Sequence, residues 1–100
     1  MVVKGDNRRE PYDHVKLKRS IQIACNKRPI ATSIIDNVVN DIEARLRDKS
    51  QEEIAAREIG ELVIEHLRKL DDVAYVRFAS VYRNFQDKEE FLSELEDLRR

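Results

Sequence analysis

The chain has 100 residues, of which 39% are charged and 41% hydrophobic, with a net charge of −1, two glycines and two prolines. This size and composition fit one soluble, helix-rich domain and exclude a disordered segment, a β-sandwich and a second core. No apolar run approaches the ~20 residues that cross a bilayer, and the first residues do not resemble a signal peptide. We therefore expect a cytoplasmic protein without membrane contact.

The predicted elements begin with a β-hairpin over residues 1–13. The β-branched stretch Val2-Val3 is followed by Gly5-Asp6-Asn7, whose residues tolerate the positive φ angles of a tight loop. Pro11 places the second strand at an edge or near its end. Because an isolated two-stranded hairpin is marginal in water, this hairpin is expected to pack on the helices that follow.

Helical periodicity predicts three helices next, over about residues 14–27, 33–48 and 56–70. Asp13 is suited to N-cap the first, and Pro29 ends it. Their inward-facing positions are Leu17, Ile21, Ala24 and Cys25, then Ile35, Val38, Val39, Ile42 and Leu46, then Ile59, Leu62, Val63, Leu67 and Leu70. Ile54 adds a short extended piece before the third helix. Gly60 lies inside that helix at a cost of ~1 kcal/mol, which indicates tight helix packing or the close approach of another group.

A fourth helix is predicted over residues 72–85 and a fifth over 88–98. In the fourth, one face carries Tyr75, Phe78, Tyr82 and Phe85, while valines and small residues cover most of the rest. A helix that is apolar nearly all round is typically buried, although its arginines and tyrosine hydroxyls need partners. Asp87 begins a variant of the capping box, so we predict a break there and a last helix that docks on the domain or on a second copy. The apolar face of that last helix comprises Phe91, Leu92, Leu95 and Leu98.

Catalytic and metal-binding patterns have no support in the sequence. Cys25 is the one cysteine, which excludes a multi-cysteine zinc site, and His14 and His66 lie far apart without a neighbouring ligand. No Ser/His/Asp or Cys/His arrangement stands out. We therefore predict that the chain holds no zinc and is not an enzyme.

Positive charge gathers at the N-terminus, where the first 30 residues hold eight lysines and arginines against three acidic residues. Solvated helix surfaces explain this adequately, but the pattern also suits a small polyanion better than a DNA duplex. The Walker and dinucleotide patterns are both absent, since the two glycines stand far apart at positions 5 and 60, so any phosphate must be held by side-chain cations or at a helix N-terminus. Lys4 on the first strand and Lys16 in the first helical turn would meet if the hairpin folds onto that helix.

The N-terminal motif Val2-Val3-Lys4, followed by Arg9-Glu10-Pro11-Tyr12-Asp13 and by Lys16 and Leu17, resembles the opening of the ATP-cone, a regulatory domain that binds ATP or dATP. Further motifs are similar to the ATP-cone of NrdR, the repressor of ribonucleotide reductase genes. They are Lys27-Arg28-Pro29, Glu58 to Val63, Leu70-Asp71 and, most specifically, VAYVRFASVYRNF at 73–85. The resemblance covers residues 2–92 and implies an α+β fold: an N-terminal β-hairpin lid packed on a bundle of four to five helices, as a single domain over residues 1–100.

The resemblance also implies a nucleotide between lid and bundle, with a role for each matching residue. Val3 and Leu17 would flank the adenine, Lys4 and Lys16 would contact phosphates, Glu10 would hydrogen-bond base or ribose, and Tyr82 would line the pocket. Structural roles stay open beside these. Val3, Leu17 and Tyr82 could simply pack in the core, and Glu10 could pair with Arg8 or Arg9.

Two departures from the family pattern bear on affinity. Gly5 stands where ATP-cones often carry an arginine, which removes a phosphate donor and lets the backbone come closer. Ala55-Ala56 replace a Ser or Thr at the start of the third helix. We expect ATP or dATP to bind with Mg²⁺ and to change a homo-oligomeric state.

DNA binding is a separate matter, because NrdR repressors bind DNA through a Cys-rich zinc ribbon that precedes the cone. The sequence begins at the cone's first strand, so we expect this chain to reach DNA only through such a ribbon. Two alternatives remain: a helical oligomerisation module without ligand, and an ATP-cone detached from a ribonucleotide reductase subunit.

Overall fold

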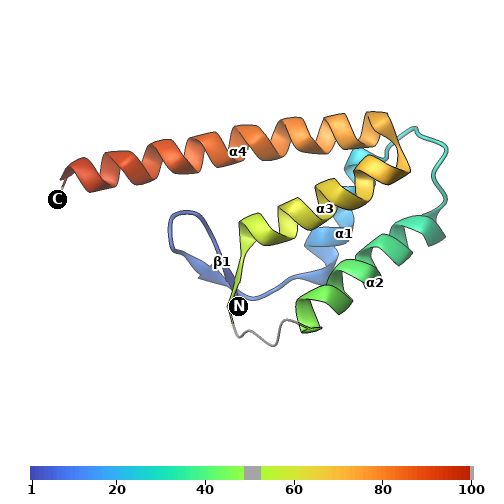
Figure 1. The fold of residues 1–100 in the computed structure, drawn as a ribbon, viewed down its shortest axis with the longest axis horizontal. Helices are drawn as coiled ribbons and strands as arrows, with labels where there is room; N and C mark the ends of the chain where they lie inside the picture. The colour runs from blue at the N-terminus through green and yellow to red at the C-terminus, as the bar shows by residue number, and fades with distance from the viewer. Residues whose placement is uncertain (49–52, 100) are drawn as a thin grey trace.

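The computed structural model describes residues 1–48 and 53–99 (Figure 1). It has a small three-stranded sheet at the N-terminal end and four helices behind it. Strand β1 (Val2–Val3) pairs antiparallel with β2 (Arg9–Glu10) and parallel with β3 (Ile54–Ala55), which gives the order β2-β1-β3. The predicted α+β fold with an N-terminal hairpin is confirmed.

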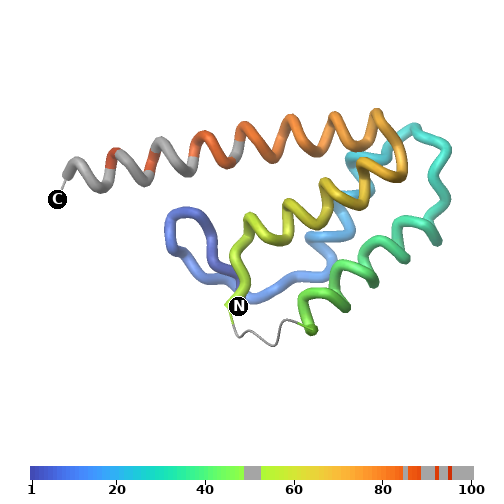
Figure 2. The backbone as a smooth tube through the Cα atoms, in the orientation of Figure 1, coloured from blue at the N-terminus to red at the C-terminus, as the bar shows by residue number. Residues whose placement is uncertain are grey.

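The hairpin is held by a third strand and does not rest on helix packing alone. Strand β3, the short extended piece expected at Ile54, pairs with the free edge of β1 and continues directly into α3 (Ala56–Leu70), as the backbone path in Figure 2 shows. The turn is closed by hydrogen bonds from Lys4 N to Arg8 O at 2.8 Å and from Asn7 N to Lys4 O at 2.9 Å. Asn7, at φ 69°, adopts the left-handed conformation that the turn requires.

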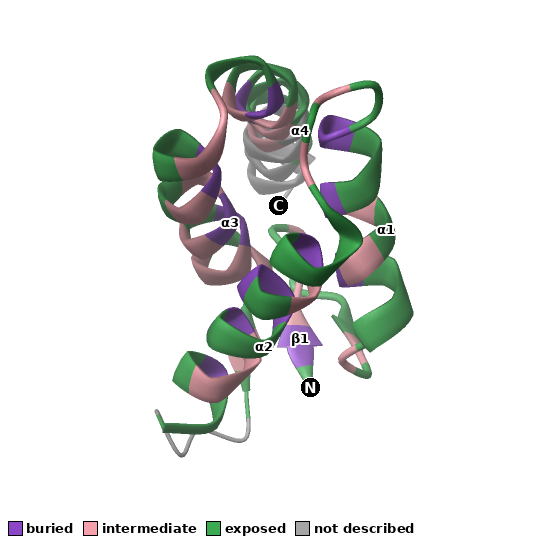
Figure 3. Cartoon of the chain, turned by 90° about the vertical axis from the view of Figure 1, so that its right-hand side faces the viewer, coloured by how far each residue is buried: buried purple, intermediate pink, exposed green. Residues whose placement is uncertain are grey.

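The core lies between the apolar stripes of α1 (His14–Ala24), α2 (Thr32–Asp48) and α3, which face one another in Figure 3. The predicted inward positions of the first two helices are all buried, and those of α3 are buried or partly buried. The largest fully buried side chains are Ile21, Val39, Ile42, Val63 and Leu67. Cys25 is a buried member of this core, as expected for a small apolar residue.

Helix α1 ends at Ala24, earlier than the predicted end near residue 27. The chain turns away through Lys27, which has a left-handed φ of 62°. The carbonyl groups at this end accept hydrogen bonds from Arg77 on the last helix, whose Nη1 lies 3.3 Å from Ala24 O and 2.7 Å from Asn26 O. The guanidinium thus satisfies backbone acceptors that a longer α1 would have paired itself.

The predicted break near Asp87 is wrong, because α4 (Asp72–Arg99) is one continuous helix of 28 residues. The reason is the absence of a strong breaker, since the sequence has no glycine or proline after Gly60. Asp87 therefore lies inside a helix and does not cap one. The side chain of Phe85, expected on the aromatic face, and those of Phe91 and Leu98, expected on the last apolar face, lie outside the described residues.

Burial of the aromatic-rich stretch is also less complete than predicted. Ala74 and Ala79 are buried against the domain, whereas Val76 and Val81 are 58% and 70% exposed. Figure 1 shows why: α4 lies across α1 and α3 on one side, and its opposite side faces solvent. Ala74 and Ala79, with Tyr75 and Phe78 packed against the core, therefore lie on the helix-packing face, and the valines lie on the surface.

Asp71 joins α3 to α4 and gives a pH-dependent prediction. Its Oδ1 accepts the Ala74 N–H at 2.9 Å, and both oxygens lie 3.1 Å from Arg28 Nε. The Ala74 N–H and the Arg28 guanidinium lower the pKa of this carboxyl, so the interaction stabilises the fold above the unfolded-state pKa and is lost as pH falls through the lower folded-state pKa. We expect Asp71→Asn to lower the melting temperature by a few degrees at pH 7 and by progressively less as pH falls below about 3.9, the usual pKa of an aspartate in an unfolded chain.

Asparagine keeps an oxygen for the Ala74 N–H, so this substitution tests the charge rather than the cap. Asp72→Asn, in the first turn of the same helix, is the matched control. Melting curves recorded from pH 7 to pH 3 decide the matter. An Asp71→Asn deficit of the same size at both ends of that range would contradict this account.

Candidate functional site

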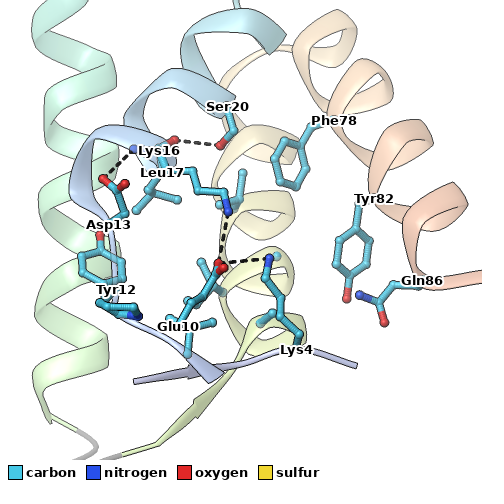
Figure 4. Close-up of a pocket in the computed structure, with 16 residues that line it drawn as sticks. Lys4, Glu10, Tyr12, Asp13, Lys16, Leu17, Ser20, Phe78, Tyr82 and Gln86 are labelled. Carbon is cyan, nitrogen blue, oxygen red and sulfur yellow. Dashed lines mark hydrogen bonds and ion pairs between the residues drawn. The ribbon is translucent and has the colours of Figure 1, made fainter. Parts of the chain in front are cut away.

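A cavity of about 230 Å³ opens between the hairpin and helices α1, α3 and α4 (Figure 4). Its wall is mainly apolar, and its rim carries charged and polar side chains, an arrangement typical of small-molecule sites. The apolar lining comprises Val2, Pro11, Leu17, Ala56, Ile59, Val63 and Phe78. The polar lining comprises Lys4, Glu10, Tyr12, Asp13, Lys16, Ser20, Tyr82 and Gln86.

Two ammonium groups meet at one side of this cavity. Lys4 directly follows β1, and Lys16 lies in the first turn of α1. Asp13 caps that helix, because its Oδ1 accepts a hydrogen bond from the Lys16 N–H at 3.2 Å. Glu10 Oε1 lies 3.3 Å from Lys4 Nζ and 3.1 Å from Lys16 Nζ. Hydrogen bonds from Lys16 and Lys4 lower the pKa of Glu10, so its carboxylate is ionised at neutral pH. The hairpin therefore folds onto α1 with both lysines at one point.

Tyr82 forms the opposite wall and depends on a glycine. Its hydroxyl lies 3.2 Å from Glu61 Oε1 and 3.4 Å from Arg57 O on α3, and its ring stacks near Phe78 at 6.4 Å between centroids. A Cβ added at Gly60 would lie 2.7 Å from Tyr82 Cδ2 and closer still to Cε2. Burial and then the charge of Glu61 raise the pKa of Tyr82 to about 12, so the hydroxyl stays protonated.

The segment between β2 and α1 is anchored on the far side by α2. Glu43 Oε2 accepts the Tyr12 hydroxyl at 2.8 Å and lies 2.9 Å from His14 Nδ1. Burial alone would raise the pKa of Glu43, but hydrogen bonds from His14 and Tyr12 outweigh it and lower that pKa. This anchor fixes the short connection that carries Glu10 at one end and Lys16 at the other.

Comparison with known families decides what kind of domain this is. The sequence profile described as "ATP cone domain" matches residues 1–88. The chain belongs to the ATP-cone family. The location of the cavity, under the hairpin and against the helices, agrees with the arrangement that the resemblance implied for an ATP-cone.

This ATP-cone also matches curated relatives over almost its whole length. It is 48% identical over 98 residues to "Transcriptional repressor NrdR" of Geotalea uraniireducens, covering 98% of the chain and 65% of the relative. The proteins of the same name from Sorangium cellulosum and Pelotomaculum thermopropionicum are 52% identical over 94 and 98 residues, covering 94% and 98% of the chain. The chain spans 61% and 59% of those two relatives, so it corresponds to less than two thirds of each.

The cone brings together five of the seven residues predicted for the site. Val3 and Gly5 do not line this cavity. The five residues that do are Lys4, Glu10, Lys16, Leu17 and Tyr82. Val2 lines it instead of Val3 because neighbouring strand residues point to opposite faces.

The ion-pair partners of Glu10 are not the arginines that the sequence left open as partners. Glu10 contacts the two lysines, while Arg8 pairs with Asp6 and Arg9 pairs with Glu53. The arginines of the hairpin are thus engaged outside the cavity, and the lysines are the cations that line it.

Sequence reasoning missed Phe78, Gly60 and Gln86 as lining residues of the cone. Phe78 shares a helical face with Tyr82, and an interior helical glycine indicated a close approach, so both carried a signal. Gln86 carried none. Among the described residues no group of His, Cys, Asp and Glu side chains could hold a metal ion, and no described helix is both long and apolar enough for a membrane span.

Proposed function

We propose that this ATP-cone binds ATP or dATP in the cavity between the hairpin and the helices. The observation that carries the proposal is the convergence of Lys4 and Lys16 at the side of an apolar cavity. The volume of about 230 Å³ is below the ~300–1,000 Å³ of sites that enclose drug-sized ligands, so it suits a base and ribose with phosphates at the open lysine side.

Each residue then has a chemical role. Leu17, with Val2 and Phe78 nearby, offers apolar surface for a purine, and Tyr82 adds an aromatic wall. Lys4 and Lys16 neutralise phosphates, and Glu10 hydrogen-bonds the base or ribose once the ligand is bound. Mg²⁺ would arrive with the phosphates as their counterion. Val3 and Gly5 flank Lys4 on the hairpin, and their contact with nucleotide depends on the hairpin closing further.

A calorimetric titration with ATP and dATP in the presence of Mg²⁺ tests the proposal. We expect saturable binding of at least one of the two, and a raised melting temperature. At 100 times the dissociation constant the added free energy of unfolding is ~2.7 kcal/mol. Absence of heat and of any shift in melting temperature at millimolar nucleotide would reject the proposed function.

We further propose that this cone is the nucleotide-sensing part of an NrdR-type transcriptional repressor of ribonucleotide reductase genes that acts in the cytoplasm. The names of its relatives favour this over a cone detached from a reductase subunit. In this proposal the nucleotide binds one homo-oligomeric assembly better than another and so controls how separate zinc ribbons meet DNA. A zinc ribbon encoded upstream in the reading frame would support the repressor over the reductase subunit.

The second candidate, an oligomerisation module without ligand, is favoured by one observation. Leu92 and Leu95 on the far part of α4 are 53% and 38% exposed. Light scattering with and without dATP distinguishes the candidates. A change of molar mass with dATP supports the sensing domain, whereas an oligomer whose molar mass is the same with and without dATP supports the module.

A further inference from the structure

The ligand-free site contains its own anion. One carboxylate oxygen, Glu10 Oε1, contacts both ammonium groups, at 3.1 Å from Lys16 Nζ and 3.3 Å from Lys4 Nζ (Figure 4). A phosphate oxygen at the same point would also contact both lysines. The carboxylate therefore occupies the place that best suits a bridging phosphate oxygen.

The connectivity makes this contact more than a surface ion pair. Lys4 directly follows β1, Glu10 ends β2 and Lys16 lies in α1, so the three charges join both arms of the hairpin to the helix behind them. Lys4 is the most buried of the three, with 17% of its side chain exposed against 41% for Glu10. Glu10 can thus swing toward solvent with little rearrangement, whereas Lys4 cannot.

We propose that Glu10 is an internal anion, which holds the empty site together and must leave the two lysines when phosphate binds. The proposal rests on the proposed function and deepens it, because it assigns Glu10 a role in the empty state. A carboxylate and a phosphate cannot share this point, since like charges in contact repel. The apparent affinity for phosphate is the intrinsic affinity multiplied by the fraction of molecules in which the internal contact is broken and the lysines are available.

The test compares Glu10→Gln with the unchanged chain, using inorganic tripolyphosphate and ATP as separate ligands in a calorimeter at low ionic strength. We expect tripolyphosphate to bind Glu10→Gln about 3- to 10-fold more tightly, because its competitor for a charged hydrogen bond is gone. Glu53→Gln is the matched control, since Glu53 pairs with Arg9 of the same strand outside the cavity. It should leave the affinity within about twofold.

Equal or weaker binding of tripolyphosphate by Glu10→Gln would overturn the inference, as would the same gain in Glu53→Gln. The ATP arm separates this from the proposed function. If the unchanged chain binds ATP and Glu10→Gln gains no affinity for tripolyphosphate, only the inference fails. If the unchanged chain binds no ATP while Glu10→Gln gains affinity for tripolyphosphate, the nucleotide function fails and the internal anion stands.

A measurement on the unchanged chain covers the case in which Glu10→Gln does not fold. The ¹³C resonance of the Glu10 carboxyl group should move when tripolyphosphate is added, because the carboxylate exchanges ammonium partners for water. The Glu53 resonance should stay in place. A saturating addition that moves neither resonance would overturn the proposal.

Discussion

Replacing Lys4 with alanine is expected to weaken the binding of ATP and dATP by about 10- to 150-fold. The substitution removes one of two ammonium groups that meet beside the cavity, and a hydrogen bond to a charged group contributes about 1.5–3 kcal/mol. The loss should fall mainly on nucleotides with several phosphates. The melting temperature of the ligand-free domain should stay within a few degrees, because the hairpin is also held by strand β3.

Lys18→Ala is the control for this prediction. Lys18 lies on the same helix as Lys16, but its ammonium group pairs with Asp36 Oδ1 at 2.8 Å, away from the cavity. The control removes the same charge and should leave nucleotide affinity within about twofold. Calorimetry on both variants measures the difference. An unchanged affinity in Lys4→Ala would dismiss the assigned role of this residue.

Replacing Gly60 with alanine is expected to destabilise the domain, although the same change in an ordinary helix stabilises by ~1 kcal/mol. The added methyl group would overlap the ring of Tyr82, which must move or force the helices apart, and overpacking of this kind costs about 1–3 kcal/mol. A displaced Tyr82 no longer walls the cavity, so ATP affinity should also fall several-fold.

A double-mutant cycle isolates this contact. The three atoms nearest to the new methyl group all belong to the Tyr82 ring, so in a Tyr82→Ala background Gly60→Ala should raise the melting temperature and leave ATP affinity unchanged. Thermal unfolding and calorimetry on the unchanged chain, the two single variants and the double variant measure the coupling between Gly60 and Tyr82 in stability and in ATP affinity. Additive effects in both measurements would show that the glycine acts through something other than the tyrosine ring.

The helices and the core could be predicted because each apolar stripe keeps a regular period and a single partner face. Ile35, Val39 and Ile42 repeat as a helix requires, and all three are buried. The end of α1 and the length of α4 could not be predicted from such local rules. A distant arginine, Arg77, serves the carbonyl groups where α1 stops, and Asp87 resembles a cap but lies in a continuous helix.

The candidate site was predictable where the signal lay in one short motif and unpredictable where it depended on packing. Lys4 and Lys16 belong to the hairpin and the helix next to it, so sequence proximity brings them together. The resemblance implies Val3 at the adenine, whereas Val2 lines the cavity, because strand alternation admits either residue and the face that turns inward depends on pairing with β3. The contact between Gly60 and Tyr82 joins two helices, and the sequence indicates only that some group comes close.

A crystal structure of the domain with ATP and Mg²⁺ tests the central claim most directly. The account predicts phosphate oxygens in hydrogen-bond contact with both Lys4 Nζ and Lys16 Nζ, the adenine against Leu17 with Tyr82 lining the pocket, and Glu10 turned away from the ammonium groups. A nucleotide bound elsewhere on the domain, with Glu10 still between the two lysines, would contradict it.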